Sequence, residues 1–187
     1  MSDQAAPWLI CLNLNREYVT PGRPLFAENG EAAAACARRV VHHARASGWT
    51  VAHVQTRGAR LANADQFQRP IEGLEPLASE PLFLVRWRSA FAHSDLRDRI
   101  SAERPSRIFV VGFTLAHEGL ATLLHGLDSG LPVRFIADAC ASPPIGDRTA
   151  AEIDRATLAI AGSLSALADS REIFQVANNV VVSLRGA

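Results

Sequence analysis

The sequence predicts an α/β fold, a doubly wound sandwich in which helices cover both faces of a mostly parallel sheet. Two observations lead to this prediction. Short apolar runs rich in β-branched residues recur along the chain, and segments with a helical period separate them. Strands that alternate with helices form parallel sheets, because each helical crossover returns the chain to the end of the sheet at which the previous strand began. The chain shows no internal repeat, low-complexity tract or linker, so we expect residues 1–187 to form a single domain.

The predicted strands are short apolar runs bounded by polar or turn-forming residues. The run at 108–111 is apolar throughout, which is typical of a strand buried on both faces of a sheet. The first run ends abruptly in polar side chains, beginning with Asn13. The predicted strands span residues 8–14, 49–56, 82–86, 108–111, 132–137, 173–176 and 180–184.

Helix signals occupy most of the segments between these runs. Alanines dominate the first helix, for which Asn29 is the expected N-cap and Gly48 the residue after its end. Glu152 follows Thr149 by three residues, the spacing of a capping box at the start of the last helix. The stretch 57–81 has no clean period, so we expect a long connection that covers a site or is mobile. The predicted helices span residues 30–47, 94–102, a segment from about 115 to 130, and 149–168.

Composition and charge exclude several classes of function. The 19 basic residues balance 19 acidic ones, so no charge excess favours nucleic acid or an anionic membrane as a partner. All 19 basic residues are arginines, and the absence of lysine excludes any mechanism that needs a lysine amine. No apolar run approaches the roughly 20 residues that a membrane span requires. The amino-terminal residues also lack the pattern of a signal peptide, and we expect a cytoplasmic protein.

The cysteines and histidines do not predict a metal site or a bound cofactor. Cys11, Cys36 and Cys140 are too widely spaced for a disulfide framework or a paired metal motif. The pair His117-Glu118 would need a histidine at position 121 to complete a zinc-binding helix motif, and Ala121 stands there. We therefore expect neither metal nor cofactor.

The segment 107–122 predicts the location of the functional site. An apolar strand runs into Gly112, and a helical period follows. In open α/β sheets, ligands bind at the carboxyl ends of the strands. Residues 114–119 would then face a ligand, with the free N–H groups of a helix start directed at it. His117 and Glu118 lie at the centre of this segment.

Four short motifs, taken in chain order, resemble those of one known family. The chain carries NLNREY at 13–18, RWRSAF at 86–91 followed by SDL at 94–96, Gly112 ten residues before Thr122, and DACAS at 138–142. Together they resemble the isochorismatase-like cysteine hydrolase superfamily over about residues 8–170. The resemblance implies a three-layer sandwich with a sheet of about six strands, and a homodimer or homotetramer.

The resemblance also implies a catalytic triad, and this chain departs from it at each position. In the family, a cysteine attacks the substrate, an aspartate takes its proton and a lysine stabilises the site electrostatically. The aspartate position falls on Asn13, the lysine position on Val85 or Arg86, and the cysteine position on Glu118. A neutral amide cannot act as a general base. The triad is therefore predicted to be degenerate.

These substitutions leave three hypotheses open. The first is a protein that binds a small molecule in the family's cleft without thiol hydrolysis, a pseudoenzyme. The second is an active hydrolase on a C–N or vinyl-ether bond that uses Glu118 as a base. In it, Arg86 would pair with Glu118 through the bidentate geometry of a guanidinium. The third is a structural oligomer subunit whose pocket is filled by Trp87 and Phe91.

The candidate site follows from these hypotheses. Asn13, Arg86 and Glu118 are the candidates for the catalytic positions. The predicted ligand-lining residues are Tyr18, Trp87, Phe91 and His117, for which packing in the core is the alternative.

Overall fold

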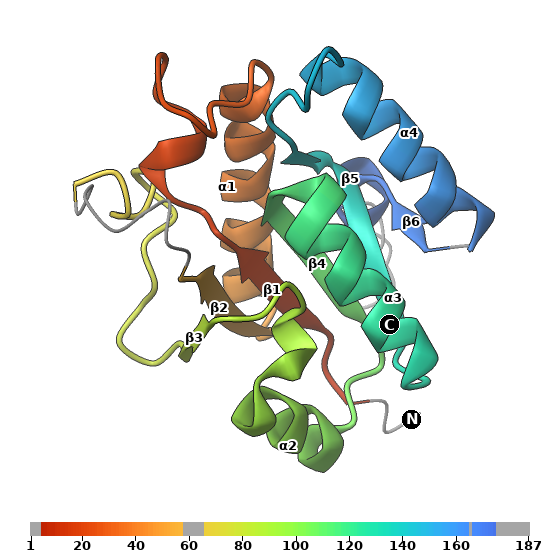
Figure 1. The fold of residues 1–187 in the computed structure, drawn as a ribbon. Helices are drawn as coiled ribbons and strands as arrows, with labels where there is room; N and C mark the ends of the chain where they lie inside the picture. Colours follow the sequence, from red (N-terminus) through yellow and green to blue (C-terminus); the bar gives the residue numbers. More distant parts are fainter. Residues whose placement is uncertain (1–4, 58–65, 165, 175–187) are drawn as a thin grey trace, which may run out of the picture.

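A computed structural model describes residues 5–57, 66–164 and 166–174 of the chain. One six-stranded sheet runs through it in the order β3-β2-β1-β4-β5-β6, and all of its pairings are parallel (Figure 1). The predicted α/β class is confirmed. The strands are β1 (Trp8–Leu12), β2 (Thr50–Thr56), β3 (Leu82–Val85), β4 (Ile108–Phe113), β5 (Val133–Ala141) and β6 (Leu167–Ala168).

Helices cover both faces of the sheet, which makes a three-layer sandwich (Figure 1). The alternation of side chains along β1 divides the core. Leu9 and Cys11 pack with α1, whereas Trp8 and Ile10 pack with the other helices. The helices are α1 (Gly30–Ala46), α2 (Ser94–Glu103), α3 (Leu120–Asp128) and α4 (Ala150–Ser163). Across the described residues, no helix is long and apolar enough to cross a membrane.

The strand order reverses between β1 and β4, and this switch point fixes where a ligand can bind. The two strands approach very closely there. Gly112 has a φ of +113°, and a Cβ at this position would clash with the carbonyl oxygen of Leu12. The register of β4 against β5 also shifts between Val110 and Gly112. Only glycine fits this crowded point, so Gly112 allows the ends of β1 and β4 to lie together.

The carboxyl-terminal part of the described chain corrects two predictions. The last helix ends at Ser163, because Leu167 joins the sheet by pairing with Phe135 of β5. Sheet pairing prevails here over local helix propensity. The predicted strand at 173–176 is wrong for its first residues. Residues 170–174 form a helical turn, in which Arg171 N–H donates to the carboxylate of Asp169. The predicted strand at 180–184 lies outside the described residues.

The helix-capping predictions had mixed outcomes. The capping box at α4 is confirmed, with reciprocal hydrogen bonds between Thr149 and Glu152. Asn29 occupies the N-cap position of α1 but does not cap the helix. Its amide instead donates to the carboxylate of Asp154 at 2.8 Å, which ties the start of α1 to α4. A tertiary hydrogen bond thus uses the Asn29 side chain that was predicted to cap the helix.

Candidate functional site

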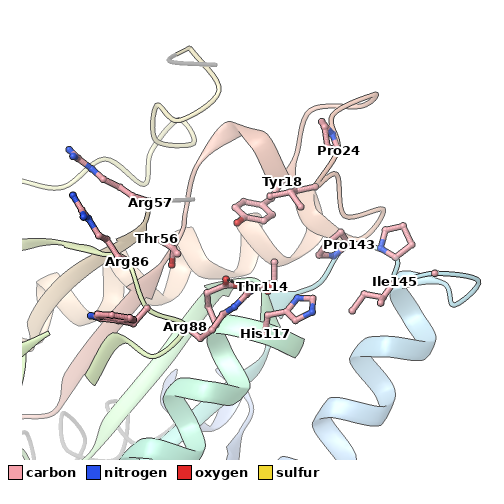
Figure 2. A pocket seen from close by; sticks show the side chains of 15 residues that line it. Tyr18, Pro24, Thr56, Arg57, Arg86, Arg88, Thr114, His117, Pro143 and Ile145 are labelled. Atoms are coloured by element: carbon pink, nitrogen blue, oxygen red, sulfur yellow. Dashed lines mark hydrogen bonds and ion pairs between the residues drawn. The ribbon is translucent and has the colours of Figure 1, made fainter. Parts of the chain in front are cut away.

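A cavity of about 680 Å³ opens at the carboxyl ends of the parallel strands (Figure 2). Its walls come from the segments that follow β2, β3, β4 and β5, and from the short 3-10 turn Arg16–Tyr18 with the loop after it. This is the place that the strand order predicts, because ligands of open α/β sheets bind outside the strand ends at a switch point. The cavity is open, so the prediction of a pocket filled by Trp87 and Phe91 is not met.

Glu118 lies on the wall of this cavity, in a single π-helical turn, Leu115–Gly119, that leads into α3. Its side chain is only 9% exposed, and each of its carboxylate oxygens has a partner. Arg88 Nη1 donates to Oε1 at 2.9 Å, and Thr114 Oγ1 donates to Oε2 at 2.6 Å. The carboxylate is thereby fixed in orientation.

The predicted pairing of Arg86 with Glu118 is wrong, because Arg88 takes that place. Strand β3 ends at Val85, whose side chain is buried in the core. The chain then bends toward α3, where Ala90 N–H donates to Thr122 Oγ1 at 2.9 Å. This anchor brings Arg88 over the π-helical turn, whereas Arg86 remains nearer the end of β2 on the cavity wall.

Asn13 lies beside the site but outside the lining of the large cavity. Its Nδ2 donates to the carbonyl of Phe113 at 2.9 Å and to Thr56 Oγ1 at 3.3 Å. Its Oδ1 accepts from Thr56 N–H at 2.7 Å. Asn13 has a φ of 46°, a conformation that asparagine tolerates better than most residues. The side chain thus ties together the ends of β1, β2 and β4, a role that needs both the donor and the acceptor of an amide.

Three of the four predicted ligand-lining residues do line the cavity: Tyr18, Trp87 and His117. The Trp87 side chain is prominent at the rim, with the residue 66% exposed. The Tyr18 ring stacks on Phe113, with centroids 5.0 Å apart. Burial, together with the charges of Glu118 and Glu17, raises the pKa of Tyr18, so its phenol stays neutral.

Phe91 corrects the fourth of these predictions. It is fully buried and packs against His125 and Gly126 of α3, away from the cavity. The Ser-Ala-Phe segment that contains it forms the 3-10 turn Ala90–Ala92. The large ring therefore anchors the chain that carries Arg88 and does not contact a ligand.

The cysteines cannot supply a nucleophile to this cavity. Cys11, Cys36 and Cys140 are all buried, and none of them lines it. Burial raises the pKa of Cys140, which keeps the thiol protonated. Within the described residues, no group of three or more His, Cys, Asp or Glu side chains could hold a metal ion.

Sequence reasoning does not single out Arg57 and Arg88, which both line the cavity. A signal for Arg57 exists in principle, because it directly follows the predicted strand at 49–56 and so lies at the ligand-binding edge. Arg88 lacks such a signal. Its position depends on how the chain bends after β3, and that bend is set by tertiary contacts.

Comparison with known proteins places this arrangement in a family. A family model described as the isochorismatase domain matches residues 7–166. The YddQ protein of Bacillus subtilis, named as an uncharacterized isochorismatase family protein, is 28% identical over 144 residues, covering 72% of this chain and 77% of YddQ. An isochorismatase from Pseudomonas putida superposes with a TM-score of 0.79 at 22% identity, covering 92% of this chain and 93% of that one. A cysteine hydrolase from Pseudomonas syringae superposes with a TM-score of 0.76 at 18% identity, covering 94% and 97%. The structural matches support the fold, and the family model spans most of the sequence: this chain belongs to the isochorismatase family.

Proposed function

We propose that this protein binds a small molecule in the large cavity and does not hydrolyse it through a thiol. The observation that carries the proposal is the state of Glu118. It stands at the position where the family resemblance expects the cysteine, and both of its oxygens are held by Arg88 and Thr114. Thiol hydrolysis needs an accessible thiolate, and the three cysteines of this chain are buried away from the cavity.

The position of the family's aspartate supports the same proposal. Asn13 is neutral, and its amide is engaged with the backbone at Phe113 and Thr56. A general base must reach the proton that it removes and must be able to accept it. Asn13 satisfies neither condition in this geometry. The chain also has no lysine for the third position.

A second candidate function is hydrolysis of a C–N or vinyl-ether bond with Glu118 as a base for water. It is favoured by the placement of a shielded carboxylate on the cavity wall, with guanidinium groups nearby to stabilise a developing negative charge. This chemistry requires Glu118 to exchange the Thr114 or Arg88 hydrogen bond for a water molecule. Arg88 would be the partner of the carboxylate, and Arg86 would be free to contact the substrate.

Hydrolysis assays on the purified protein distinguish the two functions. The panel contains amide, carbamoyl and vinyl-ether substrates, tested with the wild type, Glu118→Gln and the control Glu72→Gln, which alters an exposed carboxylate. We expect no turnover above background in any of the three proteins. The proposal would be overturned in favour of the second function if the wild type and Glu72→Gln showed turnover and Glu118→Gln did not.

A further inference from the structure

We infer that Arg57 and Arg86 form an oxyanion site at one side of the cavity, so that the ligand carries a carboxylate or phosphate group. The inference rests on the proposed function in one respect: the ligand occupies this cavity. It adds the chemical class of that ligand, which neither the family assignment nor the degenerate triad specifies.

Register places the two arginines side by side. Thr56 pairs with Val85 where β2 and β3 run parallel, so Arg57 and Arg86 directly follow paired residues. Arg57 N–H donates to the Val85 carbonyl at 2.8 Å, which extends the pairing past the strand end. Neighbouring strands lie about 4.8 Å apart. Figure 2 shows both side chains at one side of the cavity, with their guanidinium groups pointing the same way, outward from Tyr18 and His117 toward the rim.

The charges around the cavity are out of balance. Among the residues that the structure describes, its lining contains three arginines and a single carboxylate, that of Glu118, which Arg88 already neutralises. Neither Arg57 nor Arg86 has an ion pair within the described residues. The whole chain has no net charge, so this excess is local. Two adjacent positive charges at the mouth of a cavity repel each other and attract an anion.

The chemistry of the guanidinium group specifies the kind of anion. It is planar, permanently charged, and matches carboxylate and phosphate oxygens with paired N–H donors. Two such groups together can bind several oxygens of one ligand group. Both arginines are exposed, so their guanidinium groups stay hydrated until an anion binds.

The remainder of the cavity favours an apolar body attached to the anion. Trp87 lies next to Arg86 in sequence and presents an exposed ring at the rim. Across the cavity the loop after β5 contributes Pro143, Pro144 and Ile145. Flat apolar groups pack well against such side chains. The ligand class is therefore a small molecule with one oxyanion and one compact apolar portion.

Direct binding measurements with simple probes test this inference. Benzoate, phenyl phosphate and uncharged benzamide share a ring and differ in the attached group. Each is titrated by calorimetry, and by tryptophan fluorescence with Trp87→Phe to assign the signal. We expect both anions to bind more tightly than benzamide. Arg57→Gln/Arg86→Gln should weaken anion binding about tenfold, whereas benzamide binding should not change. The tighter of the two anions identifies the preferred oxyanion.

The control variant removes the same charge elsewhere. Arg99→Gln/Arg107→Gln changes two exposed arginines, one on α2 and one before β4 at the opposite end of the sheet, and should retain the affinity for anions. Thermal melts verify that all variants fold. If the anions bind no more tightly than benzamide, or if the Arg57/Arg86 variant retains their affinity, the inference is wrong. Because no turnover is measured, a hydrolytic protein would overturn the proposed function and leave the oxyanion site standing.

Discussion

Two glutamates in this molecule have side chains of nearly equal exposure but differ in what their carboxylates connect. The side chain of Glu80 is 8% exposed and that of Glu118 is 9% exposed, and each accepts from an arginine. Arg45 approaches Glu80 through Nε at 2.8 Å and Nη2 at 2.9 Å, in a bidentate pair. Glu118 has a single contact from Arg88 at 2.9 Å. The side chain of Arg45 is 25% exposed, whereas that of Arg88 is 70% exposed.

The difference lies in what each carboxylate connects. Glu80 also accepts from Leu77 N–H at 2.9 Å and contacts His53 Nε2 at 2.9 Å. It therefore ties α1, β2 and the connection before β3 into one cluster, which we call the Glu80 cluster: Arg45, His53, Leu77 and Glu80. Within the described part of the chain, Glu118 connects only its own turn and the segment after β3, and it faces a cavity. The two carboxylates are equally buried but differ in role. Glu80 belongs to a structural ion pair, whereas Glu118 belongs to a pair that faces the candidate ligand site.

The largest effect on stability should come from Glu80→Gln. An amide offers one acceptor oxygen and no charge, so Arg45, His53 and Leu77 cannot all keep their partner. We expect a loss of about 2–4 kcal/mol in the free energy of unfolding, because removal of one member of a shielded pair leaves the others unpaired. Urea denaturation monitored by circular dichroism measures it. Glu72→Gln, at an exposed site nearby, should change the free energy by less than about 0.5 kcal/mol.

The pH dependence of stability sharpens this prediction. Burial opposes ionisation of Glu80, but hydrogen bonds from Arg45, Leu77 and His53 outweigh it and lower its pKa from 4.5 to about 2. The unfolded chain binds this proton first, so the contribution of Glu80 is complete above its ordinary pKa and is lost as the pH falls toward 2. We expect the stability difference between the wild type and Glu80→Gln to shrink between pH 5 and pH 3, by the linkage relation. A difference that stays constant over this range would contradict the assigned role.

His53 adds a second dependence of stability on pH, in the same direction. Burial lowers the pKa of His53 despite its contact with Glu80. The unfolded state therefore takes up a proton on this histidine before the folded state does, and stability falls as the pH drops below the ordinary value of 6.5. Both groups favour the folded state at neutral pH.

The same comparison shows which features of the fold and of the site could be predicted from the sequence alone. The alternation of apolar runs with helical segments predicts the α/β class, and motif order predicts the family, because both depend on patterns local to the chain. The sequence also places Glu118 at the ligand-binding edge, since that position follows directly from the end of β4. Neither glutamate's partner could be predicted in this way. Arg45 meets Glu80 across 35 residues, and Arg88 meets Glu118 across 30.

The errors have a related physical origin. Phe91 and Arg86 are both in a segment that resembles the family motif, but the motif does not specify the bend after β3. That bend places Phe91 in the core and brings Arg88, rather than Arg86, to Glu118. The last helix is misjudged for a comparable reason. Its continuation past Ser163 has an apolar pattern, and pairing with β5 converts part of it to a strand.

Glu118→Gln should affect stability much less than Glu80→Gln does. The amide oxygen can still accept from Thr114 or Arg88, and the guanidinium of Arg88 is 70% exposed and remains solvated. Pairs with one well-solvated partner contribute little, so we expect a loss of about 1 kcal/mol or less in the free energy of unfolding. Arg88→Gln, measured in the same urea series, should fall in the same range. If instead Glu118→Gln destabilises the protein as much as Glu80→Gln does, Glu118 is a structural residue. Its place on the cavity wall would then be a consequence of packing, and neither candidate function could be assigned to its carboxylate.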